Sequence, residues 1–341
     1  MRRRRRTIIA LSVLLVLVGL YTGGWFYARS MVLAELDRQV AALGAQGITV
    51  EQLEPRVTGF PFSMGVEADA VQMSHETGLS WTGTGLDGWV SVFAPTTARI
   101  DMSAPQEFTV RPVAGGPAIT VSIAGARGFA TAGFDGALER AQLDVDDIVF
   151  DALGAPEMRV TALRANAVQG VDDTAPDAFG ADILLQDVAL TPSPLPQLGT
   201  QIDAILADVI VIGPLPREPN RQELAAWRDA GGRLRIESAG LDWGEVHIRV
   251  SGDLVLDENL QPEGTLEVVL NGHSQLLAAA VDAGLVGSAE AGMASFGLSA
   301  LSSPGEDGRM VVRAPLSIAH QEVRLGGLPL PLRLPAIQWP R

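Results

Sequence analysis

The stretch Phe62-Ser-Met-Gly-Val-Glu-Ala-Asp-Ala70 decides the fold class, because apolar residues alternate in it with small or charged ones. This period of two is typical of a β-strand with one buried and one solvated face. Shorter stretches of the same kind follow, separated by Gly- or Pro-containing turns at intervals of about 8–12 residues. They lie at Leu79–Trp81, Trp89–Phe93, Ala98–Met102, Phe108–Val110 and Ile119–Ile123. The pattern predicts an antiparallel meander.

The rest of the chain continues this pattern with a few helical interruptions. Further strands are predicted near residues 143–150, 158–165, 181–190, 234–238, 244–256, 264–270, 310–318 and 323–325. Ile202–Ile212 is almost wholly apolar, so periodicity does not decide between helix and strand. Asn220 and Glu223 form a capping-box pattern before a short helix, and Ser274 and Ser288 are expected to cap two more. We therefore predict a mainly β fold: an elongated, curved antiparallel sheet with short helices near 220–230 and 274–301.

The N-terminus has the pattern of a membrane anchor. Arg2–Arg6 precede an uncharged segment, Thr7–Tyr27, whose 21 residues match a hydrocarbon core of about 30 Å. Trp25, Phe26 and Tyr27 stand at its end, where aromatic rings prefer the interface. The positive-inside rule then predicts a cytoplasmic tail (1–6), a transmembrane helix (7–27) and a periplasmic remainder, so that the protein sits in a bacterial inner membrane. A cleaved signal peptide is the alternative, but no small-x-small cleavage site follows the apolar segment.

Beyond the anchor, Leu33, Leu36, Val40 and Leu43 form one apolar stripe on a juxtamembrane amphipathic helix, predicted over residues 28–45. The stripe is expected to pack on the domain's own sheet, because two heptads are too few for a stable coiled coil. The proline-rich segment Thr191–Pro196 suggests a boundary between β regions at 46–190 and 191–341. Four prolines within 328–340 predict an extended tail along a sheet edge.

Composition excludes several classes of protein. After Arg2–Arg6 and Arg29 are set aside, 19 basic and 40 acidic residues remain, a net charge of −21. So acidic a domain repels nucleic acid. The chain has no cysteine, which excludes disulfides, thiolate zinc sites and cysteine nucleophiles.

No catalytic or metal-binding residue and no cofactor is predicted. The four histidines, His75, His247, His273 and His320, lack the spacing of a local metal motif. Asp144, Asp146 and Asp147 lack the glycine and terminal glutamate of a calcium loop. Gly83, Gly85 and Gly88 match G-x-G-x-x-G, but the sequence continues as a strand, which offers no helix N-terminus to a phosphate.

Aromatic and other apolar residues suggest a different kind of site. They cluster within the first predicted strands and are candidates either for the core or for an apolar groove that takes acyl chains. The groove candidates are Phe60, Phe62, Met64, Val66, Trp81, Trp89 and Phe93. Alternating apolar and polar residues are compatible with a closed core and with an open groove, so the sequence does not decide between these two arrangements.

An ordered set of segments resembles the bacterial domain of unknown function 2125 family over nearly the whole chain. The set comprises Val57-Thr-Gly-Phe-Pro-Phe62, Gly252-Asp-Leu-Val-Leu-Asp257, Pro262-Glu-Gly-Thr-Leu-Glu267, Asn271-Gly-His-Ser-Gln-Leu-Leu277, Pro315-Leu-Ser-Ile318 and Val323-Arg-Leu-Gly-Gly-Leu-Pro-Leu-Pro-Leu332. The family is distantly similar to AsmA-like envelope proteins. That wider resemblance implies a non-enzymatic envelope protein that binds lipid in a β-groove, with the bilayer, an amphiphile or envelope proteins as partners. A scaffold with a closed β core is the alternative.

Overall fold

A computed structural model describes residues 2–45, 47–75, 77–111, 117–152, 155, 157–172, 175, 177–213, 220–305, 310–337 and 339, with the backbone alone for 2–14 and 328–333. The chain forms two compact units, Met1–Asp135 and Gly136–Arg341. Each unit is built on antiparallel strands, so the predicted mainly β, antiparallel fold is confirmed.

The first unit is a helix followed by a meander. Its elements are α1 (Arg2–Ala45), β1 (Ile48–Thr58), β2 (Ser63–His75), β3 (Ser80–Ser91), β4 (Ala94–Met102), β5 (Gln106–Val110) and β6 (Ile119–Ala132). β4 and β5 both lie between β3 and β6, as two halves of one broken strand. The break falls just before β5, where Pro105 has no N–H to donate to the ladder.

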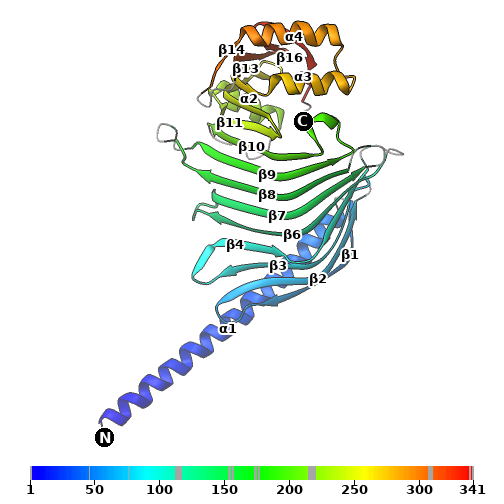
Figure 1. The fold of residues 1–341 in the computed structure, drawn as a ribbon. Helices are drawn as coiled ribbons and strands as arrows, with labels where there is room; N and C mark the ends of the chain where they lie inside the picture. Colours follow the sequence, from blue (N-terminus) through cyan, green and yellow to red (C-terminus); the bar gives the residue numbers. More distant parts are fainter. Residues whose placement is uncertain are drawn as a thin grey trace. The chain divides into compact units, whose positions relative to one another are not determined.

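Helix α1 is one continuous helix, where the sequence predicted an anchor and a separate amphipathic helix. Figure 1 shows its N-terminal end projecting away from the strands of its unit. The stripe of Leu33, Leu36, Val40 and Leu43 is half-buried, and the helix packs along β1, in line with packing on the domain's own sheet. It ends at Ala45, and Gly47 follows in the left-handed region (φ 83°) that glycine tolerates best.

Within the described residues, no helix is both long enough and apolar enough to cross a membrane. Residues 7–14 of the predicted anchor lie outside the described side chains.

The second unit continues the antiparallel pairing through more strands. They are β7 (Leu138–Ala152), β8 (Glu157–Gln169), β9 (Phe179–Thr191), β10 (Gln201–Ile212), β11 (Arg233–Trp243), β12 (Val246–Leu256), β13 (Pro262–Asn271), β14 (Ser302–Pro304), β15 (Met310–Ala319), β16 (Glu322–Leu325) and β17 (Leu328–Arg333). Neighbours pair in chain order from β7 to β13, and β15 then lies between β13 on one edge and β14 and β16 on the other. The ambiguous apolar segment is thus a strand, β10. The proline-rich segment 191–196 lies inside this unit, between β9 and β10, which pair with one another.

Short helices join these strands: η1 (Pro196–Leu198), α2 (Arg221–Asp229), α3 (His273–Asp282) and α4 (Ser288–Ala300). The predicted cap of α2 is present, because the Asn220 side chain accepts a hydrogen bond from the Glu223 backbone N–H at 2.9 Å. The other two caps were predicted wrongly. Gly272 and Gly287 hold the N-cap positions of α3 and α4, and Ser288 is the first helical residue.

Candidate functional site

Three parallel rows of apolar residues cross eight strands of the second unit. Directly paired residues of neighbouring strands share a face, so each row is read from the register. The first row contains Val145, Leu163, Leu185, Ile205, Leu241, Ile248, Leu270 and Val312. The second and third rows lie next to it on one side, begin at Leu143 and Ala141, and contain only alanine, valine, isoleucine, leucine and glycine. We call these three rows the apolar face.

In the described part of the chain, helices cover the apolar face over its last strands. Val246, Leu270, Val312 and Ala314 form a buried cluster, on which Leu198 of η1, Leu276 of α3 and Leu298 of α4 pack. Figure 1 shows α3 and α4 together beside β13, β14 and β16. This is the core of the second unit.

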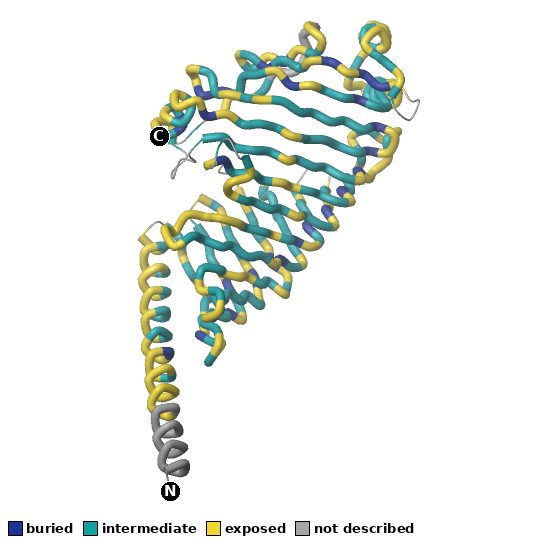
Figure 2. Tube along the Cα trace, turned by 90° about the vertical axis from the view of Figure 1, so that its left-hand side faces the viewer, coloured by how far each residue is buried: buried dark blue, intermediate teal, exposed yellow. Residues whose placement is uncertain are grey.

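Over β7–β11 the same rows remain half-exposed. Val145 is the one buried member there, and Leu143 and Ile183 are exposed at 40% and 45%. Figure 2 shows that most strand residues are of intermediate burial, as expected where a sheet is not sandwiched between other layers. The face opposite carries one buried row of its own: Ile148, Val160, Val188 and Ile202.

A pocket of about 440 Å³ lies next to the apolar face, and its lining is almost entirely apolar. Val211, Leu234 and Leu254 belong to the adjoining row of the same face and form its floor. Leu224 and Trp227 of α2 line it, as do Ile337 and Trp339 of the C-terminal tail. Its volume lies within the range of pockets for small apolar ligands.

The tail is fixed at this pocket by specific hydrogen bonds. Gln261, which is buried, accepts from the Ile337 N–H at 2.8 Å and donates to the Ile337 carbonyl at 3.1 Å. Trp339 Nε1 donates to the Leu260 carbonyl at 2.8 Å. The tail was predicted to run along a sheet edge. Its β17 part does pair with β16, and Ile337 and Trp339 line one side of the pocket.

Trp227 contributes a buried donor without an acceptor. Its Nε1 atom is shielded from solvent and has no hydrogen-bond partner among the described residues. A buried polar group left unpaired in this way costs about 1–3 kcal/mol.

The seven groove candidates from the sequence all lie in the first unit, and they do not form one surface. Phe60, Phe62 and Phe93 lie on two neighbouring turns. Trp89 pairs with Gly65 on one face of β2–β3, whereas Met64 and Val66 lie on the other face. Trp81 stacks on Phe108, with ring centroids 5.6 Å apart.

The glycine motif Gly83, Gly85 and Gly88 has a packing role at its first position. A Cβ on Gly83 would lie 1.6 Å from Oε1 of Gln106, so only glycine leaves room for this side chain. Gln106 is fully buried; it accepts from Trp81 Nε1 at 3.0 Å and donates to the carbonyls of Thr84 and Ala104. Gly83 is therefore explained by packing, because the buried and hydrogen-bonded amide of Gln106 occupies the space that a side chain would need.

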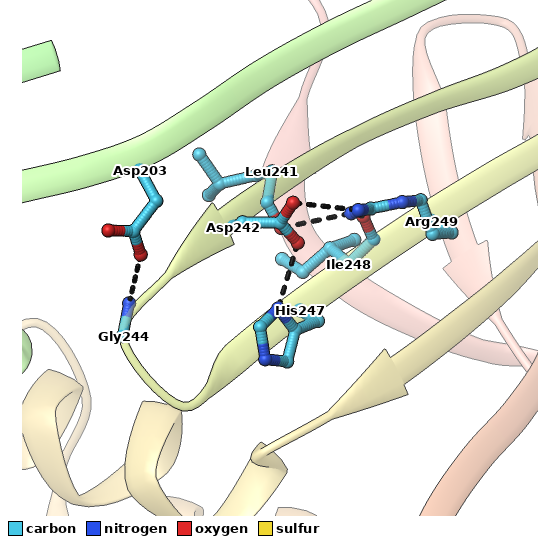
Figure 3. Close-up of polar contacts among 7 residues, drawn as sticks. All are labelled: Asp203, Leu241, Asp242, Gly244, His247, Ile248 and Arg249. Atoms are coloured by element: carbon cyan, nitrogen blue, oxygen red, sulfur yellow. Dashed lines mark hydrogen bonds and ion pairs between the residues drawn. The ribbon is translucent and has the colours of Figure 1, made fainter. Parts of the chain in front are cut away.

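The most organised polar cluster lies on the β11–β12 hairpin (Figure 3). Asp242 bonds His247 Nδ1 at 2.8 Å and accepts from Arg249 at 2.7 Å. Arg249 holds the pKa of Asp242 below its ordinary value, against the opposing effect of burial and with a further contribution from His247. Asp203 accepts from the Gly244 N–H and so ties the turn to β10.

This cluster resembles part of an acid–base dyad, but it lacks a nucleophile. In the described part of the chain no serine or threonine hydroxyl is hydrogen-bonded to His247. Arg249 of β12 also donates to the Leu241 carbonyl of β11 at 3.4 Å, so the cluster links the two strands of the hairpin. Its contacts are those of a structural network.

The histidines do not assemble a metal site among the described residues. His75 ends β2, His273 begins α3, and His320 lies in the β15–β16 turn. No group of three or more histidine, aspartate or glutamate side chains in the described ranges is arranged to hold a metal ion. Asp144, Asp146 and Asp147 stand on β7, where Asp147 pairs with Arg159 at 2.7 Å.

The fold and the site define a mainly β protein with an apolar sheet face and an adjoining apolar pocket. The chain matches the family described as "uncharacterized protein conserved in bacteria (DUF2125)" over residues 25–332, and it belongs to that family. No curated protein matches it, and neither does any solved structure. The more distant likeness to AsmA-like proteins stays a prediction.

Proposed function

We propose that this protein is a membrane-anchored, non-enzymatic protein of the bacterial envelope that binds the acyl chain of an amphiphile on its apolar face. The carrying observation is the run of three apolar rows across eight strands, half-exposed over β7–β11. Monomeric proteins rarely expose continuous apolar surface of this kind unless it serves binding.

The pocket beside α2 extends the apolar face and suits the end of an acyl chain. Its floor continues the row pattern through Val211 and Leu234, so a chain can pass from the face into the pocket without crossing a charged side chain. Burial of each methylene contributes about 0.8 kcal/mol.

The anchor is the second part of the proposal. Leu15, Val16, Leu17, Val18 and Leu20 of α1 are more than half exposed, so in the described chain nothing packs over these apolar side chains. A bilayer around Thr7–Tyr27 would cover them, with Arg2–Arg6 in the cytoplasm and both β units in the periplasm.

Native mass spectrometry of the full chain, purified from bacterial membranes in a mild detergent, tests the amphiphile. We expect retained phospholipid or another amphiphile that is released on unfolding and identified after extraction. The test variant is Ile183→Glu, which places a carboxylate on the apolar face. A wild-type mass without adducts, or adducts that Ile183→Glu does not reduce, would instead support a scaffold that docks proteins.

A further inference from the structure

The first unit ends in a charge-free aromatic patch beside the point where α1 leaves its sheet. The patch consists of Tyr21, Phe26, Phe60, Phe62, Val92 and Phe93. All six are exposed, at 45% for Tyr21 and Val92 and up to 79% for Phe93. They come from α1, the β1–β2 turn and the β3–β4 turn, which lie side by side.

Contacts between the helix and the turns fix this arrangement. Trp25 is buried, donates through Nε1 to the Ser63 carbonyl at 3.1 Å, and meets the Phe60 ring edge-on at 5.3 Å. Phe26 stacks on Phe60, and the Tyr21 hydroxyl donates to the Pro61 carbonyl. The Val92 N–H donates to the Phe62 carbonyl at 3.0 Å, which joins the second turn to the first.

The surroundings of the patch point to one kind of occupant. No charged residue occurs in residues 7–28, 57–66 or 88–98, which is unusual in a chain with 65 charged residues. On the N-terminal side, the patch is continuous with the exposed leucines and valines of residues 15–20. Aromatic rings at the end of a membrane-spanning helix prefer the boundary between headgroups and acyl chains. A protein partner would gain nothing from the continuity with the helix, whereas a bilayer covers both surfaces at once.

We infer that the aromatic patch inserts into the periplasmic interface of the bilayer, so that the β1–β2 and β3–β4 turns rest in the headgroup layer. The inference rests on the proposed anchor, because α1 positions the turns relative to the membrane. It adds a second attachment, which would hold the strands of the first unit at the surface and keep them from swinging freely on the helix.

Because the chain has no cysteine, single-cysteine labelling tests the inference directly. The variants Phe93→Cys, Phe134→Cys and Leu17→Cys of the full chain are labelled with NBD and reconstituted into phosphatidylethanolamine–phosphatidylglycerol vesicles. Half of the vesicles carry lipid with a headgroup spin label. Phe134 is the matched control, since it is a fully exposed phenylalanine of the same unit outside the patch. Leu17 reports on the anchor alone.

We expect the spin-labelled lipid to remove about half or more of the emission at position 93, as for groups buried about 5–10 Å into the headgroup boundary, and to leave position 134 unchanged. If a headgroup or acyl-chain spin label quenched the probe at position 17 but left position 93 as bright as position 134, the inference would be overturned. The proposed anchor would then still stand. If lipid spin labels, including ones placed deeper on the acyl chain, quenched neither 17 nor 93, the anchor and the inference would fail together. A blue-shifted but unquenched probe at position 93 would indicate a protein partner or a second copy, and would also overturn it.

Discussion

Ile183 offers the sharpest perturbation of the apolar face, because it lies in the middle row and is 45% exposed. Full burial of an isoleucine contributes about 1.5–3 kcal/mol, so the part that is buried here contributes about 1 kcal/mol. The carboxylate of Ile183→Glu can reach solvent and avoids the cost of a buried unpaired charge. We therefore expect the unfolding free energy to fall by only about 1 kcal/mol, and the melting temperature by about 2–4 °C.

Amphiphile binding should fall far more than stability. An acyl chain lying over Ile183 buries two or three methylenes there, at about 0.8 kcal/mol each, so affinity should drop by about 15- to 50-fold. Thermal unfolding in lipid nanodiscs measures the first effect, and the fraction of lipid adducts in native mass spectra measures the second. Leu138→Glu is the matched control, since Leu138 is 41% exposed and alternation on β7 puts it on the opposite face from Leu143.

Two outcomes would refute this reasoning. A stability loss above about 3 kcal/mol would mean that Ile183 belongs to a closed core, where a charge cannot reach water. An equal loss of adducts in Ile183→Glu and Leu138→Glu would mean that the apolar face is not the site of binding.

Three further predictions concern the rest of the molecule. Asp242→Asn should cost about 1–3 kcal/mol at pH 7, measured by denaturant unfolding, because the charged bond from Arg249 is lost. The folded pKa of Asp242 is lowered, so the stability that this carboxylate contributes to the wild-type protein should fade as the pH drops below about 4. The variant should lack that loss. Unfolding free energies of the two proteins that fall in parallel with pH would contradict this role of Asp242. Burial, and then the carboxylate of Glu67, raise the pKa of Asp87. Asp87→Asn should therefore raise the unfolding free energy by about 0.2–1 kcal/mol at pH 7, and this gain should vanish in acid. A lower unfolding free energy of the variant at pH 7 would contradict this prediction. Trp339→Ala should release the tail from the pocket at a cost of about 1–2 kcal/mol, seen as faster proteolysis after residue 333; an unchanged cleavage rate would show that the bond to Leu260 does not hold the tail.

Alternation along single strands could be read directly from the sequence. The pattern from Phe62 to Ala70 predicted β2, and the Asn220–Glu223 pair predicted the start of α2, because both signals are local. β10 stayed ambiguous for a physical reason. Ile202 is buried on one face and Ile205 belongs to the apolar face on the other, so the strand shows no alternation.

Features that depend on strand register could not be predicted in this way. Val145, Leu163 and Leu185 are about twenty residues apart in the sequence, and only their pairing makes them neighbours. The same holds for Phe62 and Phe93, which looked like members of a groove and lie on adjacent turns beside α1. The pocket was missed because it needs Trp227 of α2 and Trp339 of the tail, which no sequence spacing relates.

Photocrosslinking with a phospholipid that carries a diazirine on its acyl chain tests the central claim most directly. The full chain is reconstituted in nanodiscs, irradiated and digested, and the labelled peptides are identified by mass spectrometry. The account predicts labels on the strands around Ile183, Ile205 and Val211, in addition to the labels on α1 that any anchored protein acquires. Labelling confined to residues 1–45 and the aromatic patch, with none on β7–β11 or the pocket, would contradict it.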